Sequence, residues 1–174
     1  MKRYILPLLA LLWLAGCNGS NTALNEKLKA AVTEGEAGPE GYKTINMAEL
    51  TDFDWDMLYF FQPNEDEQAI SDVIGFTWDG AEVPENHRRL LFVKGEEVVS
   101  YVDYYYNDFP LFVYGCGDDK WVYPKSRSEF ASFKYCSGEQ EIYTFIPVPC
   151  VDNIRLLMDN KCPEKNGEAA AVAE

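Results

Sequence analysis

Histidine is nearly missing from this sequence. His87 is the one histidine among 174 residues, and no G-x-S-x-G elbow, H-E-x-x-H pair or phosphate-binding loop accompanies it in the chain. A catalytic histidine needs a nucleophile or a metal ion within reach, so we expect His87 to lie on the surface. The sequence therefore indicates no catalytic residue, no metal site and no cofactor, and it favours a protein that is not an enzyme.

Basic residues are also few. The chain has 15 lysines and arginines against 29 aspartates and glutamates, a formal net charge of −14. Nucleic-acid binding draws its affinity largely from basic side chains that neutralise phosphates, so we expect no nucleic-acid partner. A basic protein or peptide is the better match in charge. The alternative is that the acidity serves solubility alone.

A long apolar run is missing as well. The longest one spans residues 4–14, YILPLLALLWL, which is too short for a transmembrane helix of about 20 residues. Lys2 and Arg3 precede this run, and the small residues Ala15 and Gly16 follow it, directly before Cys17. This order of charged, apolar and small residues predicts a secretory signal in residues 1–16.

The tetrapeptide LAGC at residues 14–17 resembles the lipobox of bacterial lipoproteins that signal peptidase II cleaves. The resemblance implies that the Cys17 thiol carries diacylglycerol, that the chain is cut before Cys17, and that its new N-terminus is acylated, commonly with palmitate. Asn18 follows Cys17, whereas an aspartate there retains enterobacterial lipoproteins at the inner membrane. The resemblance therefore implies an outer-membrane anchor with the domain facing the periplasm. The alternative is an ordinary secretory signal that leaves Cys17 as a thiol.

The remaining chain divides into three parts. Residues 42–162 have the length and apolar content of a single globular domain, and residues 163–174 contain nothing to bury and are predicted to be disordered. Residues 17–41 are small and polar and are predicted to be a lipidated N-terminus with a flexible tether. The alternative that part of this tether forms a short helix is left open, because three apolar residues recur there at helical spacing: Leu24, Leu28 and Val32.

Four cysteines follow Cys17: Cys116, Cys136, Cys150 and Cys162. An even number in an exported chain predicts two disulfides, with three ways of pairing. A zinc site is a poor alternative, because no two of these cysteines have the close spacing of a zinc knuckle. Pairing neighbours in sequence is the simplest choice, but a continuous helix between the last two would hold them too far apart. The connectivity stays open.

The pattern of apolar residues and turn residues predicts an α+β fold. We expect an antiparallel β-sheet of about five to seven strands with one or two short helices, held together by disulfides. One strand is expected at 54–61, and helices at 64–75, with Asn64 and Glu67 at capping-box spacing and a stop at Gly75, and at 151–160. Three hairpins are expected, with turns at Gly95, at 117–119 and at 137–138, and with paired strands at 88–93 and 98–106, 110–116 and 120–123, and 129–136 and 140–147.

Asp52, Asp54 and Asp56 have the spacing of the first half of a calcium-binding loop. That loop also needs a glycine at its position 6 and a glutamate at its position 12, where this chain has Met57 and Pro63. We therefore predict solvated carboxylates at the edge of a strand and no metal site.

Tyrosines are concentrated in the strand expected at 98–106. Neighbouring side chains on a strand point to opposite faces, so Tyr104 and Tyr106 cannot both share the core with Tyr105. Exposed tyrosines are favoured at protein interfaces, and we interpret Tyr101, Tyr104 and Tyr106 as a candidate interaction surface. The alternative is that a second layer of the fold covers this face.

Residues 53–76, which begin with an F-x-W-D strand, resemble a segment of small uncharacterised bacterial exported proteins, and no activity follows from that resemblance. The leading functional hypothesis is a membrane-anchored, periplasm-facing binding domain, for example an immunity-type lipoprotein that neutralises a toxin. The first alternative is a lipoprotein of envelope assembly or structure. A hydrolase built from scattered carboxylates is a weaker alternative.

Overall fold

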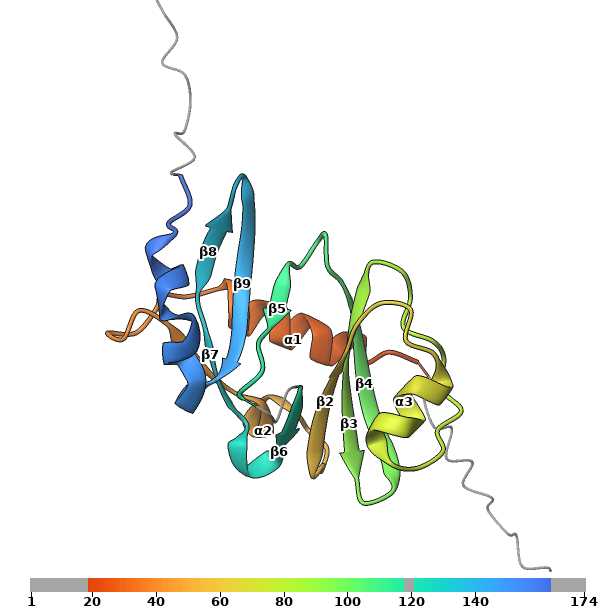
Figure 1. The fold of residues 1–174 in the computed structure, drawn as a ribbon. Helices are drawn as coiled ribbons and strands as arrows, with labels where there is room; N and C mark the ends of the chain where they lie inside the picture. Colours follow the sequence, from red (N-terminus) through yellow and green to blue (C-terminus); the bar gives the residue numbers. More distant parts are fainter. Residues whose placement is uncertain (1–18, 118–120, 164–174) are drawn as a thin grey trace, which may run out of the picture.

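The computed structural model describes residues 19–117 and 121–163, which form nine strands together with α-helices and 3-10 helices (Figure 1). The predicted signal peptide, Cys17 and residues 164–174 of the predicted tail lie outside the described residues. The strands are β1 (Lys43–Asn46), β2 (Met57–Phe61), β3 (His87–Lys94), β4 (Glu97–Tyr105), β5 (Leu111–Val113), β6 (Val122–Pro124), β7 (Glu129–Ser132), β8 (Lys134–Ser137) and β9 (Gln140–Pro147). The helices are α1 (Thr22–Thr33), α2 (Met47–Leu50), α3 (Glu67–Ile74) and the 3-10 helices η1 (Lys125–Arg127) and η2 (Val148–Asp159).

The strands are divided between two sheets. The first has five strands in the order β1-β7-β9-β5, with β8 also paired to β9, and the second has four strands in the order β4-β3-β2-β6. All pairs are antiparallel except β5 with β9, which is parallel. The predicted α+β class with a mainly antiparallel sheet is confirmed, and the structure adds that the strands make two sheets instead of one.

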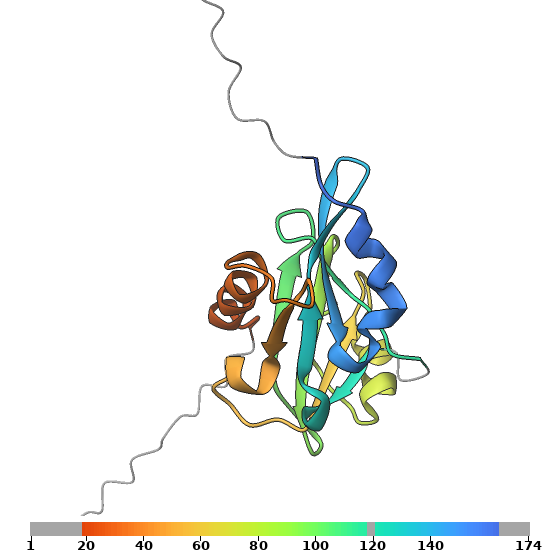
Figure 2. The same ribbon diagram turned by 90° about the vertical axis from the view of Figure 1, so that its left-hand side faces the viewer.

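Helices cover both faces of the sheets (Figure 2). On one face, α1 and α2 pack over a core to which both sheets contribute, with Trp55, Phe92, Tyr104 and Phe145 among its fully buried side chains. On the other face, α3 covers the second sheet and η2 covers the first. Each sheet is therefore buried on two sides, which explains why several strands have apolar residues in succession.

Helix α1 corrects the prediction for residues 17–41. Leu24, Leu28 and Val32 are all buried against the sheets, and the Asn21 side chain caps the helix by accepting from the Leu24 amide at 3.0 Å. The prediction of a flexible tether is therefore wrong for Thr22–Thr33, and the domain begins well before residue 42. Three apolar residues in a polar segment become a packing face only when the sheets supply a partner surface, and the local sequence does not contain that surface.

Several local predictions are confirmed. The strand at 54–61 contains β2, and the helix that ends at Gly75 is α3, with Gly75 in the left-handed conformation at a φ of 86°. The residue that caps α3 is Asp66 and not Asn64, because the Asp66 carboxylate accepts from the Ala69 amide at 2.8 Å. The hairpins β3–β4 and β8–β9 turn at Gly95 and Gly138, both of which have positive φ.

The predicted hairpin between 110–116 and 120–123 is wrong. β5 pairs with β9 in the first sheet, whereas β6 pairs with β2 in the second. Turn residues between two apolar runs predict that the chain reverses, but the pairing partner depends on strands far away in sequence. The helix expected at 151–160 is present as η2, which is a 3-10 helix and begins earlier, at Val148.

Candidate functional site

The first described residues lie along the outer edge of β4. The Asn21 amide donates to the Tyr101 carbonyl oxygen at 2.7 Å, and the Asp103 amide donates to the Ser20 Oγ at 2.8 Å. Cys17 precedes Ser20 by three residues, so a fully extended link between them spans at most about 10 Å. The candidate lipidation residue is thus joined to the domain by a very short segment. No helix in the described part of the chain is long and apolar enough to cross a membrane.

Tyr104 does not belong to an interaction surface. Its side chain is 0% exposed within the core between α1 and the sheets, and its hydroxyl donates to the Leu111 carbonyl oxygen at 3.0 Å. Burial raises the pKa of the Tyr104 phenol far above its usual value. The expectation that Tyr104 contacts a partner is wrong, because α1 forms the second layer that covers this face.

Tyr101 and Tyr106 are partly buried beneath arginines. The Arg89 guanidinium lies 4.4 Å from the centroid of the Tyr101 ring, and the Arg88 guanidinium lies 3.8 Å from that of Tyr106. The exposed tyrosine of the strand is Tyr105, at 37%. The three predicted interface tyrosines therefore do not form one exposed patch, and Tyr101 and Tyr106 pack against different cores.

His87 stands beside that exposed tyrosine, at the start of β3. Its Nδ1 lies 3.0 Å from the Glu85 carbonyl oxygen, and its ring centroid lies 5.2 Å from that of Tyr105. The imidazole is partly exposed, and its contacts are to a backbone carbonyl and an aromatic ring. Both contacts hold the imidazole against its own hairpin.

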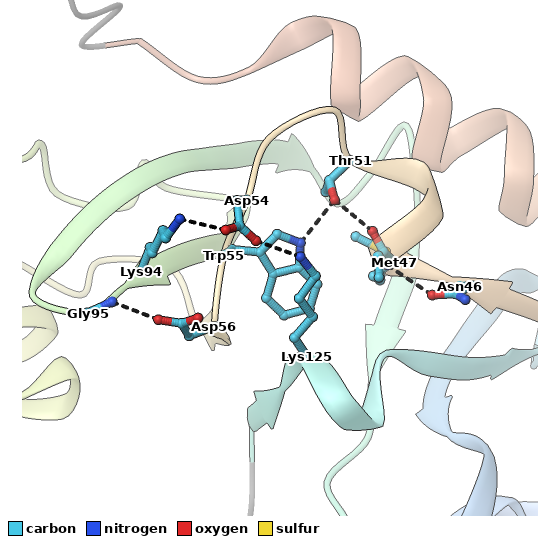
Figure 3. Close-up of polar contacts among 10 residues, drawn as sticks. Asn46, Met47, Thr51, Asp54, Trp55, Asp56, Lys94, Gly95 and Lys125 are labelled. Carbon is cyan, nitrogen blue, oxygen red and sulfur yellow. Dashed lines mark hydrogen bonds and ion pairs between the residues drawn. The ribbon is translucent and has the colours of Figure 1, made fainter.

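Asp54 lies between two lysines from distant parts of the chain (Figure 3). Its carboxylate accepts from the Lys94 ammonium at 2.5 Å and from the Lys125 ammonium at 2.8 Å. These two cations hold the pKa of Asp54 well below its usual range. Asp56, two residues on, accepts from the Gly95 amide at 2.9 Å. The aspartates thus fix the β3–β4 turn and η1, and within residues 19–117 and 121–163 no cluster of three metal-binding side chains exists.

Both predicted disulfides are confirmed, and their connectivity is resolved. Cys116 pairs with Cys150 across a Cα–Cα distance of 5.7 Å, and Cys136 pairs with Cys162 across 4.9 Å. The pairing of sequence neighbours is not found. Cys150 lies on η2 and Cys162 just after it, so the two bridges fasten this helix to the first sheet at both ends.

The sequence did not indicate an open groove that lies along β1. The groove has a volume of about 580 Å³ and is bounded by α1, the loop at 36–42, β1 and α2. Its lining residues are Ala31, Glu36, Gly38, Pro39, Glu40, Tyr42, Lys43, Thr44, Ile45, Asn46, Glu49 and Leu50. We call it the β1 groove.

Three carboxylates give the β1 groove its charge. Glu36, Glu40 and Glu49 line it, and none of them forms an ion pair with a side chain in the described ranges. The lysine of the groove, Lys43, instead donates to the carbonyl oxygens of Val32 and, at 2.8 Å, of Glu34. Burial lowers the pKa of this ammonium, and the Glu34 carboxylate opposes that shift. The lining of the β1 groove therefore carries more carboxylates than ammonium groups, and the Arg155 charge acts on one of them, Glu40.

The groove could not be predicted from the sequence, because its walls come from two regions that were predicted to be separate: the tether and the globular domain. Glu36 and Glu40 belong to the segment predicted as a tether, whereas Glu49 belongs to the predicted domain. The closest available signal was the helical spacing of Leu24, Leu28 and Val32. A docked α1 brings the end of the supposed tether back to the domain surface.

These features define an α+β domain with two interleaved disulfides and an acidic groove at the edge of one sheet. Comparison of the chain with known protein families, with curated proteins and with solved structures finds no match. The functional argument therefore depends on the geometry of this chain and on its N-terminal sequence.

Proposed function

We propose that this chain is a lipid-anchored envelope protein that binds a basic protein or peptide partner through the β1 groove. The observation that carries the proposal is the acidic lining of that groove: three carboxylates without ion-pair partners in the described structure, next to a lysine whose ammonium is bonded to backbone carbonyls. The LAGC tetrapeptide supports anchoring through Cys17, at the outer membrane and facing the periplasm.

The charge of the whole molecule favours the same partner. Removal of residues 1–16 takes away Lys2 and Arg3, so the formal net charge changes from −14 to −16. A field of one sign accelerates the approach of a partner of the opposite sign and disfavours wrong partners. A groove lined by carboxylates then orients the cationic partner once it has arrived.

A lipid anchor at Cys17 would hold one end of the domain near the membrane, because Cys17 precedes Ser20 by only three residues. The start of α1 lies near β4, where Ser20 and Asn21 are bound, and the far end of α1 reaches the β1 groove at Ala31 (Figure 1). A helix of 12 residues is about 18 Å long. Anchoring through Cys17 would therefore keep β4 close to the lipid and leave the β1 groove accessible to a partner.

The experiment is a pull-down of the full anchored chain from detergent-solubilised envelopes. We expect one dominant basic partner, and we expect the variant Glu36→Gln, Glu40→Gln, Glu49→Gln to lose most of it. The matched control replaces three exposed glutamates outside the groove, Glu82, Glu85 and Glu96, with glutamine, so that net charge changes equally. Equal recovery by both triple variants would contradict binding in the groove.

The identity of that partner distinguishes an immunity role from a role in envelope assembly. A toxin that acts in the periplasm would establish an immunity role, and a component of the envelope machinery would establish the role in assembly. The genes next to the one that encodes this chain offer the same distinction at lower cost.

A further inference from the structure

We propose that the partner binds by adding a strand to the free edge of β1, as a basic, extended peptide segment that pairs with the Thr44 N–H and C=O and with the Asn46 N–H; the Asn46 C=O, at the N-cap of α2, begins that helix. This inference rests on the proposed function and specifies how the β1 groove holds its ligand. Strand addition supplies affinity through main-chain hydrogen bonds and specificity through the side chains that flank them.

The register of β1 shows which backbone groups face the groove. Among the described strands β1 pairs only with β7. Ile45 lies opposite Phe130, and the Met47 amide continues the ladder by donating to the Ser128 carbonyl oxygen at 2.9 Å. In an antiparallel pair, alternate residues direct their N–H and C=O groups toward the partner strand. Met47, Ile45 and Lys43 therefore face β7, and Thr44 and Asn46 face away from it.

A bond at the beginning of the strand agrees with this alternation. The Tyr42 carbonyl oxygen points away from β7 and accepts from the Gly38 amide of the preceding loop at 2.9 Å. Thr44 is the next outward-facing residue, and its side chain is exposed. In residues 19–117 and 121–163, no other segment forms a hydrogen bond with the Thr44 backbone. The loop at 36–42 therefore covers the edge of β1 only as far as Tyr42, and the uncovered part of the edge begins at Thr44.

The outer edge of β4, in the other sheet, is covered by residues of the same chain and provides a comparison. The outer side of β4 is bonded to Ser20 and Asn21, which occupy the Asp103 amide and the Tyr101 carbonyl oxygen. Exposed sheet edges are usually blocked, because they promote unwanted pairing. An edge left open within an acidic groove is consistent with a strand that arrives from another molecule.

Charge selects a basic peptide over two other occupants. The C-terminal residues 164–174 contain three glutamates and one lysine, so this tail would bring negative charge to Glu36, Glu40 and Glu49. A second copy of the chain would bring a further formal net charge of −16 after removal of residues 1–16. A lysine-rich or arginine-rich strand is attracted by the same carboxylates.

The test uses a proline at the open edge. Proline is tolerated on an edge strand where the missing N–H faces solvent, but it cannot donate to an added strand. Thr44→Pro therefore removes the pairing group, and Thr44→Val keeps the N–H with a side chain of similar size. The probe is a short fluorescein-labelled peptide of alternating lysine and threonine, titrated against the full mature chain and followed by fluorescence anisotropy.

We expect the wild type and Thr44→Val to bind the probe alike, and Thr44→Pro to bind it about tenfold more weakly, as the loss of one or two net hydrogen bonds predicts. Thermal unfolding of both variants checks that the fold is kept. Amide exchange at Thr44 and Asn46 should slow when the probe binds the wild type, which gives a readout that does not depend on a variant.

Four results would overturn strand addition. Equal affinity of Thr44→Pro and wild type, with loss of binding in the triple glutamine variant, would leave groove binding intact and remove only the strand. A dimer that Thr44→Pro dissociates would identify a second copy as the occupant, and tighter probe binding after deletion of residues 164–174 would identify the tail. Absence of probe binding by the wild type would also reject strand addition. The envelope pull-down tests the proposed function independently of this titration.

Discussion

The guanidinium of Arg89 donates to both carboxylate oxygens of Asp103, at 2.7 and 2.8 Å, with Arg89 fully buried. The same guanidinium donates to the Ala81 carbonyl oxygen at 2.6 Å and lies 5.4 Å from the Trp78 ring centroid. The arginine therefore binds the segment that follows α3 to the face of β4. All its major donors have partners, which makes it a structural residue.

Arg89→Ala is expected to destabilise the protein by about 3–5 kcal/mol, because it leaves Asp103 in a largely buried site without its cation. Urea unfolding of the purified domain measures this change. Arg155 is the control, because its pair with Asp152 is solvent-exposed and such pairs contribute about 1 kcal/mol or less. Similar losses in the two variants would contradict the role assigned to Arg89.

Leu28→Ala is expected to cost about 2–5 kcal/mol, the usual range for removing a fully buried leucine side chain. The physical reason is the cavity left between α1 and the sheets. Glu26→Ala on the exposed side of the same helix serves as the control, with little expected change. If Leu28→Ala left the unfolding midpoint unchanged, α1 would not be part of the cooperative domain.

Stability is expected to fall as the pH rises above about 10, the pKa of a free tyrosine. Burial raises the pKa values of Tyr104, Tyr114 and Tyr123 in the folded protein. Above pH 10 the unfolded chain therefore loses these protons before the folded one does, and the free energy of unfolding decreases. The stabilisation is fully present below that pH.

Chemical unfolding at several pH values between 8 and 11 tests this alkaline loss. Tyr104→Phe and Tyr123→Phe should each flatten the decline, whereas Tyr105→Phe, at an exposed position, should leave it unchanged. A decline that persists undiminished in the two buried variants would show that other groups cause it.

Cys17→Ala is expected to abolish incorporation of labelled fatty acid and to release the protein from the membrane fraction. The lipobox resemblance implies that Cys17 is the acylated residue, and two or more acyl chains provide stable anchoring. Metabolic labelling followed by fractionation measures both effects. Continued labelling of the alanine variant would remove the anchor from the proposed function.

Sequence patterns predicted the parts of this fold that short segments determine. The α3 helix needs only its cap and Gly75, and each correctly predicted hairpin needs a glycine turn between two apolar runs. The disulfides were predicted from the number of cysteines. In these cases the physical signal lies within about a dozen residues, so it is readable without knowledge of the tertiary structure.

The features that carry the proposed function were not readable in that way. The β1 groove requires that α1 docks, that β1 becomes an edge strand and that the loop at 36–42 returns to the sheet. The tyrosines illustrate the same limit. Strand alternation showed that some tyrosine faces outward, but only the packing of α1 determines that the exposed one is Tyr105 and the buried one Tyr104.

The two disulfides interleave, because Cys136 lies between Cys116 and Cys150, and Cys150 lies between Cys136 and Cys162. A chain oxidised in the order in which it emerges would join Cys116 to Cys136 first, and that bond excludes both native pairs. Correction requires attack by a third thiolate on that bond, and uncatalysed rearrangement of this kind takes minutes to hours. Folding of this protein should therefore be limited by the disulfide-isomerising activity available where its cysteines are oxidised.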